Sequence, residues 1–325
     1  MANEQTNPGK KTGLAAEFSR CWGRLPDKGL FFGLLAAWLF LFQFWGNATF
    51  GYVDTSSLMG WMYNAYNNPG GNGEDSHGNL IPFVVLALFW WKRNQLLEAP
   101  HRVWWPALVG LALALVAHAL GYLTQQPLIS IVAFFGGIYM LIGLVWGPVW
   151  LRRGFFPFFL FVFCLPMSTI AQPITFPLRN FVAGAVTVVS HGLGLDVVRE
   201  GTILHNEAGT YNYDVAAPCS GLRSLIAIVA LGTVFGFMTF DKNWKRLLII
   251  ALAVPLAMIG NVARMMTIIL AAEISGQAGG NYVHTSAFFS IVPYVPAFLG
   301  IFLLGHFLRE PEPASPGLPL KPKTV

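Results

Sequence analysis

The sequence predicts an all-α integral membrane protein with about eight transmembrane helices, a short helix at the outer face and a β-hairpin beside it. Hydrophobic residues make up 55% of the 325 residues and charged residues only 11%, which argues against a large soluble domain. Several apolar runs approach or reach the roughly 20 residues that a helix needs to cross about 30 Å of hydrocarbon. The basic residues lie between these runs, in a pattern typical of membrane proteins rather than of nucleic-acid-binding proteins.

Eight apolar runs are predicted to cross the membrane. The first is too long for the core of a signal peptide and no small-residue cleavage site follows it, so we interpret it as a retained span. The second is short and begins with the polar stretch DSHGNLIP. Residues 1–29 and the Pro-rich residues 309–325 are predicted as cytoplasmic tails around a multi-pass membrane domain of residues 30–308. The predicted spans are Leu30–Trp45, Ser76–Trp91, Val103–Leu123, Leu128–Val149, Phe155–Ala171, Cys219–Phe240, Leu247–Ala272 and Ser286–Leu308.

The basic residues favour an orientation with both termini in the cytoplasm. If the eight spans alternate, sixteen of the 20 Lys and Arg residues fall on one side, which is then the cytoplasmic side of the cytoplasmic (inner) membrane. The other four, Arg179, Arg199, Arg223 and Arg264, lie in or beside the outward-facing half. The sixteen are Lys10, Lys11, Arg20, Arg24, Lys28, Lys92, Arg93, Arg102, Arg152, Arg153, Lys242, Lys245, Arg246, Arg309, Lys321 and Lys323.

The stretch Pro173–Leu195 is apolar enough to be mistaken for another span. If it crossed, the basic cluster Lys242–Arg246 would lie outside, so the charge pattern favours an interfacial or re-entrant helix at the outer face. Farther along, GTILH and TYNYDV flank the turn residues NEAG. This alternation predicts a β-hairpin over Gly201–Val215, with an irregular loop as the alternative.

Three chemically active side chains are predicted at one membrane depth near the outer face. Cys219 lies at the outer end of the sixth span, and Arg223 is four residues on, on the same helix face. Arg264 lies about 26 Å along the seventh span, close to the outer edge of the hydrocarbon. His284 precedes the eighth span on the same side.

These residue types suit acyl transfer through a thioester intermediate. A thiolate is the nucleophile and is favoured by a nearby cation or helix amino end, which makes Cys219 the candidate nucleophile. An imidazole can take the thiol proton and later protonate the leaving amine, which suits His284. A guanidinium can stabilise the oxyanion of a tetrahedral intermediate, which suits Arg264.

The cysteines also have a simpler interpretation. A cysteine at a helix end is more often a small apolar filler than a nucleophile, and this is our interpretation of Cys21 and Cys164. Three cysteines imply no disulfide framework, although a Cys164–Cys219 bridge stays open.

The other site residues have simpler interpretations as well. A histidine in an outer loop is usually a solvated surface residue, and this interpretation applies to His284 too. His77, His191 and His205 also compete with His284 for a catalytic role. Asn261 and Arg264, three residues apart on one helix, are alternatively a polar bridge between neighbouring helices.

Two rival functions belong to other classes. The first is a non-enzymatic component of extracellular polysaccharide assembly or export, in which Arg223 and Arg264 bind an anionic lipid-linked sugar. The second is a transporter. No internal repeat is evident and the inner halves of the spans carry almost no charge, which argues against transport.

The motifs resemble those of a known family. APCSGLRSLIAIVALG, then GNVARMMTIILAA, then GGNYVH resemble the Cys-Ser-Gly-x-Arg, Asn-x-x-Arg and late His motifs of the exosortase/archaeosortase family, in the same order. DSHGNLIPFVVLALFWWKR and RRGFFPFFLFVFCLPM are similar to its earlier motifs, so the resemblance covers about Ser76 to Phe307. It implies an all-helical, membrane-embedded cysteine transpeptidase.

The resemblance implies roles for particular residues. The nucleophile corresponds to Cys219, the catalytic arginine to Arg264 and the catalytic histidine to His284. The supporting motif positions are Arg223, Asn261 and Ser220.

One departure from the family pattern concerns the residue after the histidine. Bacterial members often have aspartate there, whereas this chain has Thr285. Asp214, Glu273 or a threonine hydroxyl is then expected to replace that aspartate.

The resemblance also implies the partners. The substrate is an exported protein that ends in a short recognition motif, an apolar helix and a basic tail, and the acceptor is a lipid or glycan amine. Membrane lipids surround the chain, and no metal, cofactor or nucleic acid is expected. We expect the motif to add as a strand to the predicted hairpin, where Tyr211, Tyr213 and Asp214 are the candidate substrate-binding residues.

Overall fold

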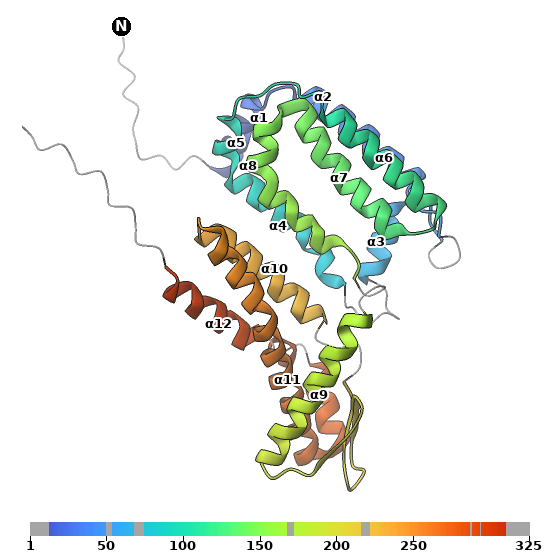
Figure 1. The fold of residues 1–325 in the computed structure, drawn as a ribbon, viewed down its shortest axis with the longest axis vertical. Helices are drawn as coiled ribbons and strands as arrows, with labels where there is room; N and C mark the ends of the chain where they lie inside the picture. Colours follow the sequence, from blue (N-terminus) through green and yellow to red (C-terminus); the bar gives the residue numbers. More distant parts are fainter. Residues whose placement is uncertain are drawn as a thin grey trace, which may run out of the picture. The chain divides into compact units, whose positions relative to one another are not determined.

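A computed structural model describes residues 13–49, 54–67, 75–167, 172–215, 222–286, 288–292 and 294–309. The chain divides into two compact units, Met1–Ser168 and Thr169–Val325. In Figure 1 the first unit is coloured from blue to green and the second from yellow-green to red.

Every regular element in the described part of the first unit is a helix. Its α-helices (α) and 3-10 helices (η) are α1 (Leu14–Arg24), α2 (Lys28–Phe44), α3 (Leu58–Asn67), η1 (Ser76–Asn79), α4 (Ile81–Trp91), α5 (Arg93–Leu97), α6 (Ala107–Leu123), α7 (Pro127–Trp146), α8 (Pro148–Phe159) and η2 (Leu160–Cys164).

The central helix of this unit is α7, which packs against α6 and α2 (Figure 1). Trp38 of α2 donates a hydrogen bond from its indole nitrogen to the Phe134 carbonyl at 3.0 Å. Its ring lies against Gly137, where a Cβ atom would come within 1.9 Å of it. The buried ring of His118 lies 3.1 Å from both the Ser130 hydroxyl and the Trp45 carbonyl. These polar groups are therefore satisfied inside an apolar bundle, as a membrane interior requires.

The fifth predicted span, Phe155–Ala171, is not a continuous helix. Helix α8 begins at Pro148, directly after Gly147 with φ 94°, and ends at Phe159, where the 3-10 turn η2 follows. Leu165 is extended, with φ −71° and ψ 122°, because a following proline disfavours the helical conformation. Residues 168–171 of this prediction lie outside the described residues.

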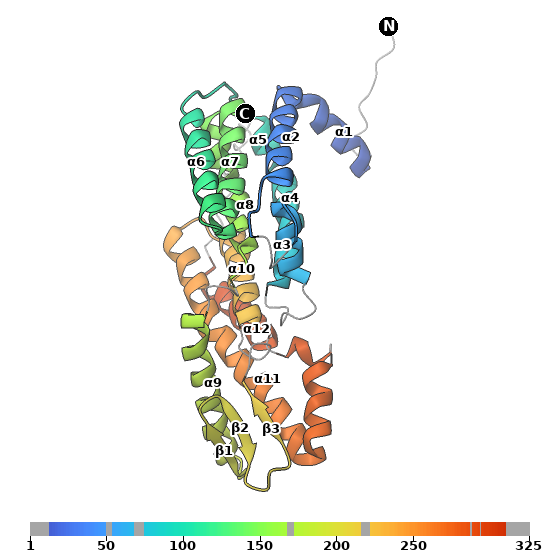
Figure 2. The ribbon, with the colours of Figure 1, turned by 90° about the vertical axis from the view of Figure 1, so that its right-hand side faces the viewer.

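The second unit combines helices with one small sheet (Figure 2). Its elements are α9 (Gln172–Gly192), β1 (Val197–Glu200), β2 (Ile203–Asn206), β3 (Asn212–Asp214), α10 (Leu222–Thr239), α11 (Asn243–Thr285), η4 (Phe289–Ile291) and α12 (Tyr294–Phe307).

Helix α11 takes part in two hydrophobic cores of this unit. One core joins it to α10 and α12, and the other joins it to α9 and the sheet. Small residues allow the close approach in the first core: a Cβ atom on Gly232 of α10 would lie 3.2 Å from Ala253 of α11. The second core holds the candidate site.

The predicted hairpin is confirmed and extended by a third strand. The sheet has the order β1-β2-β3, and both strand pairs are antiparallel. Gly201, with φ 65°, makes the tight turn between β1 and β2, and Gly209, with φ 68°, lies between β2 and β3. Leu204 pairs with Tyr213, and both side chains are buried. The sequence prediction included β2 and β3 but missed β1.

Fewer helices than the eight predicted are long and apolar enough to cross a membrane. Among the described residues, three helical segments are long and apolar enough to cross: Pro127–Trp146, Asn243–Thr285 and Phe289–Phe307. The bent pair α1 and α2, which meet at 94°, gives a fourth if it counts as one span. Other apolar helices are shorter; α4, with 11 residues, reaches only about 16 Å. Helix α9 has 21 residues and is not among the candidates. The chain is thus a mostly helical protein with several apolar helices, and the number eight stays a prediction.

Candidate functional site

Two of the predicted catalytic residues lie on one long helix. Arg264 is half-buried in α11, and Asn261 is one turn earlier and 4% exposed. His284, also half-buried, is the second-last residue of the same helix. A straight helix would separate Arg264 from His284 by about 30 Å, too far for joint action.

The helix reverses its course between these residues. Gly276 has φ 66° and ψ −165°, a non-helical conformation that is essentially restricted to glycine. The orange chain of α11 in Figure 2 changes direction at its lower end, and an orange-red segment returns beside it. As a result, His284 lies close enough to Arg264 for their charges to interact.

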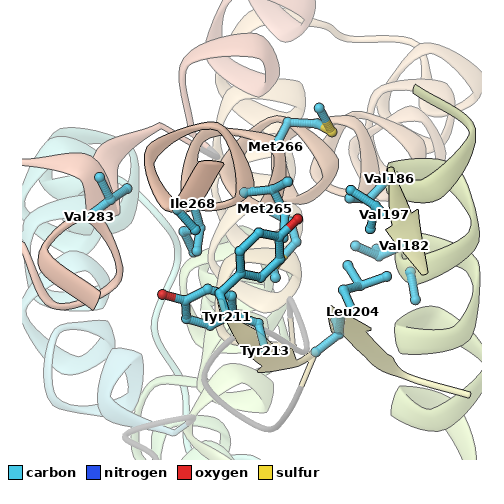
Figure 3. Packing of buried hydrophobic residues seen from close by; sticks show 14 residues of the cluster. Val182, Val186, Val197, Leu204, Tyr211, Tyr213, Met265, Met266, Ile268 and Val283 are labelled. Carbon is cyan, nitrogen blue, oxygen red and sulfur yellow. The ribbon is translucent and has the colours of Figure 1, made fainter. Parts of the chain in front are cut away.

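A shared hydrophobic core holds the two segments of α11 together. Val283, next to His284, is 7% exposed and packs in one cluster with Met265, Ile268 and Ile269 from the region around Arg264. Figure 3 shows Val283 on the returning segment, with Met265 and Ile268 on the long one. Burial of these side chains keeps the arginine and the histidine in proximity.

The residues around β3 brace both sides of Gly276. Before the glycine, Glu273 accepts a hydrogen bond from the Tyr211 hydroxyl at 2.6 Å. After it, the Tyr213 hydroxyl donates to the main-chain carbonyl of Gln277 at 2.9 Å, and its oxygen is 3.3 Å from Asn281 Oδ1. Burial, together with the bond to Glu273, raises the pKa of Tyr211, so this phenol remains a donor. The sheet therefore sets the position of the returning segment.

These contacts give Tyr211 and Tyr213 a packing role that the sequence did not predict. Both side chains are buried, 2% and 7% exposed, and Figure 3 shows their rings within the core of the unit. Asp214 is exposed and accepts a hydrogen bond from the Thr202 hydroxyl at 2.7 Å. A part for these three residues in substrate binding stays a prediction.

The groups suggested to replace the family aspartate have other partners. Glu273 binds Tyr211, and the Thr285 hydroxyl donates to the Asn281 carbonyl at 2.9 Å. Asp214 binds Thr202. Arg264 lies near enough to His284 for its charge to act on the imidazole.

Cys219 and Ser220 lie outside the described residues. Arg223 belongs to the first turn of α10, and its side chain is not described. The structure thus brings together Arg264 and His284, while the other half of the predicted site stays a prediction.

The competing histidines have local roles or lie in the other unit. His191 Nε2 is 2.8 Å from the Val197 carbonyl, between α9 and β1. His205 lies 3.8 Å from Glu200 across the sheet, and His77 belongs to the first unit. In the part of the chain that the structure describes, no group of three or more His, Cys, Asp or Glu residues is placed to hold a metal ion.

Replacing Gly276 is expected to disturb the site through the backbone alone. A Cβ atom at this position would meet nothing within 4 Å, so Gly276→Ala adds strain without a steric clash. Because misplacement by about 1 Å can cost about 100-fold in rate, we expect turnover to fall by about two orders of magnitude. Processing assays on folded, membrane-inserted protein measure this loss.

The matched control is Gly192→Ala at the end of α9, where the added Cβ also meets nothing within 4 Å and φ is not positive. It should leave turnover unchanged. Full activity of Gly276→Ala would show that the reversal does not position the site.

A family model described as transmembrane exosortase matches residues 67–303. This match spans most of the first unit and nearly all of the second, including both segments of α11. The comparisons with curated proteins and with solved structures find no match.

Proposed function

Because the chain belongs to the transmembrane exosortase family, we propose that it is a membrane-embedded cysteine transpeptidase. Its substrates are exported proteins that end in a recognition motif, an apolar helix and a basic tail. It cleaves near the motif and transfers the protein to a lipid or glycan amine. Cys219 is the nucleophile, His284 the general base and acid, and Arg264 the oxyanion-stabilising group.

One observation supports these roles above the others. Arg264 and His284 are 20 positions apart on one helix, yet a glycine reversal, a shared core and two tyrosine braces place them near enough for their charges to interact. An ionisable residue in an apolar helix is expensive and is often functional. Two such residues on segments that several contacts hold side by side favour a reactive site over two unrelated surface groups.

The proposed reaction has two acyl-transfer steps. His284 takes the proton of the Cys219 thiol, and the sulfur attacks the scissile carbonyl to form a C–S bond. Arg264 stabilises the oxyanion, and His284 then protonates the departing amine as the C–N bond breaks. The acceptor amine attacks the thioester, loses its proton to His284 and releases the sulfur. An amide bond is thus exchanged for another, with no external oxidant or reductant.

The thioester intermediate is the most direct test of this proposal. Co-expression of the chain with a tailed substrate should give a covalent adduct that neutral hydroxylamine cleaves, since thioesters react readily with this nucleophile. Mass spectrometry should place the adduct on Cys219. The Cys21→Ser variant should still form it, whereas the Cys219→Ala variant should not. An adduct that persists in Cys219→Ala would contradict the assigned nucleophile.

We further propose that both termini are cytoplasmic and that the site faces the outer side. The distribution of Lys and Arg residues supports this orientation. The sheet that follows α9 would then lie on the same side as the helix start of α10.

Reporter fusions test this orientation. A reporter inserted at Gly209, between β2 and β3, should report the outer side. The same reporter at Asn243, where α11 begins, should report the cytoplasm. A cytoplasmic signal at Gly209 would mean that α9 crosses the membrane, and the proposed placement of the site would be incorrect.

A further inference from the structure

At the outer edge of β3, the backbone N–H and C=O groups of two residues point away from the sheet. β3 is an edge strand, and the Val215 N–H donates to the Thr202 carbonyl at 2.9 Å. Hydrogen-bonded pairs alternate with non-hydrogen-bonded pairs along an antiparallel ladder. Tyr213 therefore bonds to β2, while the backbone groups of Asn212 and Asp214 point away from the sheet.

The opposite edge of the sheet is covered. Helix α9 packs against β1, and His191 from this helix lies 2.8 Å from the Val197 carbonyl. Among the described strands, β3 is the other edge strand, and the returning segment of α11 meets its outer edge through the Gln277 side chain.

One glutamine side chain imitates a neighbouring strand at this edge. The Asn212 N–H donates to Gln277 Oε1 at 2.8 Å, and Gln277 Nε2 donates to the Asn212 carbonyl at 3.4 Å. Both bonds are exposed to solvent. A carboxamide has the same donor and acceptor as a peptide group, so Gln277 satisfies Asn212 as one residue of an added strand would.

We propose that the outer edge of β3 binds an extended segment of the substrate peptide, and that this segment displaces the Gln277 side chain. The inference rests on the proposed function for the identity of the peptide, but the edge and its glutamine are features of the fold. An added strand is a common mode of peptide recognition in which main-chain bonds supply affinity. A peptide can bond to both Asn212 and Asp214, whereas Gln277 satisfies only Asn212.

Displacement of the side chain would leave the catalytic segment in place. Tyr213 holds the main-chain carbonyl of Gln277, not its carboxamide, so the returning part of α11 remains braced when the carboxamide swings away. His284 is two helical turns beyond Gln277, a rise of about 10 Å, which about three extended residues can span. The residue that pairs with Asn212 is thus expected about three positions from the scissile bond.

Peptide binding to the full-length chain in detergent micelles tests this site, with Cys219→Ala as the background so that turnover is not required. The probe is an equimolar library of biotinylated octapeptides with randomised side chains. Gln277→Ala removes the competing carboxamide and should lower the apparent Kd of the library about fivefold, the scale of one net hydrogen bond. Gln277→Glu keeps the acceptor for the Asn212 N–H but loses the donor, and should lower the Kd less.

A second library, N-methylated at every residue, carries the same side chains but has no N–H groups with which to pair as a strand. It should bind the unmodified Gln277 protein at least about fivefold more weakly than the first library. Asn206→Ala is the matched control, because Asn206 bonds to Thr210 in the loop between β2 and β3 and its loss does not open the edge. It should leave the Kd unchanged.

The outcomes separate this site from the proposed function. Equal binding of both libraries, or an unchanged Kd in Gln277→Ala and Gln277→Glu, would overturn the strand-binding site whether or not the enzyme processes substrates. Strand-dependent binding in the Cys219→Ala background, together with no thioester adduct on the protein that retains Cys219, would overturn the proposed chemistry and leave the binding site in place.

Discussion

Cys219→Ser is expected to reduce processing of a tailed substrate by at least about three orders of magnitude. The substitution keeps the size and polarity of the side chain but replaces a thiolate-forming group with a hydroxyl that is a far weaker nucleophile at neutral pH. A cysteine that only fills space or contacts a lipid would tolerate this change. Immunoblots that follow loss of the substrate tail, at equal enzyme levels in the membrane, measure the effect.

Cys21→Ser is the matched control for this substitution. Cys21 is a free, half-buried cysteine in α1, within the first unit. The same sulfur-to-oxygen exchange at this position should leave processing unchanged. Near-normal processing by Cys219→Ser would exclude the cysteine transpeptidase and favour the role in polysaccharide assembly.

Local sequence patterns predicted those elements of the second unit that depend on residues close by in the sequence. The alternation in GTILH and TYNYDV, with turn residues between them, correctly predicted strands β2 and β3. Strand β1 was missed because VVRE does not alternate, and its register depends on pairing with β2 across the Gly201 turn. In the first unit, the break before Pro166 could have been expected from the proline alone.

The sequence shows only part of the reason why Arg264 and His284 lie near each other. The order of motifs and the predicted depth placed both residues near one surface. The stretch SGQAGG, with three glycines in six residues, is a visible signal for a break. It does not show that Gly276 is the residue that leaves the helix, or that Tyr211 and Tyr213 brace the two sides. Those contacts join positions more than 60 residues apart, so no local pattern reveals them.

Arg264→Ala and His284→Ala are each expected to reduce processing by about 100- to 1,000-fold, and the double variant should be little worse than the more damaging single variant. Residues that serve one transition state do not lose activity independently, because the second substitution removes a group that no longer has its partner. Arg264→Lys should also fail, since an ammonium group keeps the charge but cannot reproduce the planar donors of a guanidinium.

The alternative for Arg264 is a polar bridge with Asn261 between helices, and it predicts a different pattern. A bridge would show its loss in the thermal stability of the purified protein, and Arg264→Lys would retain much of the activity. Added imidazole should partly restore His284→Ala, and added guanidine should partly restore Arg264→Ala, because small bases can occupy the space left beside the reacting atoms. Suppose instead that the losses of processing multiply in the double variant and that neither small molecule rescues its single variant. The two residues would then not act on the same step, even though the reversal at Gly276 places them near each other.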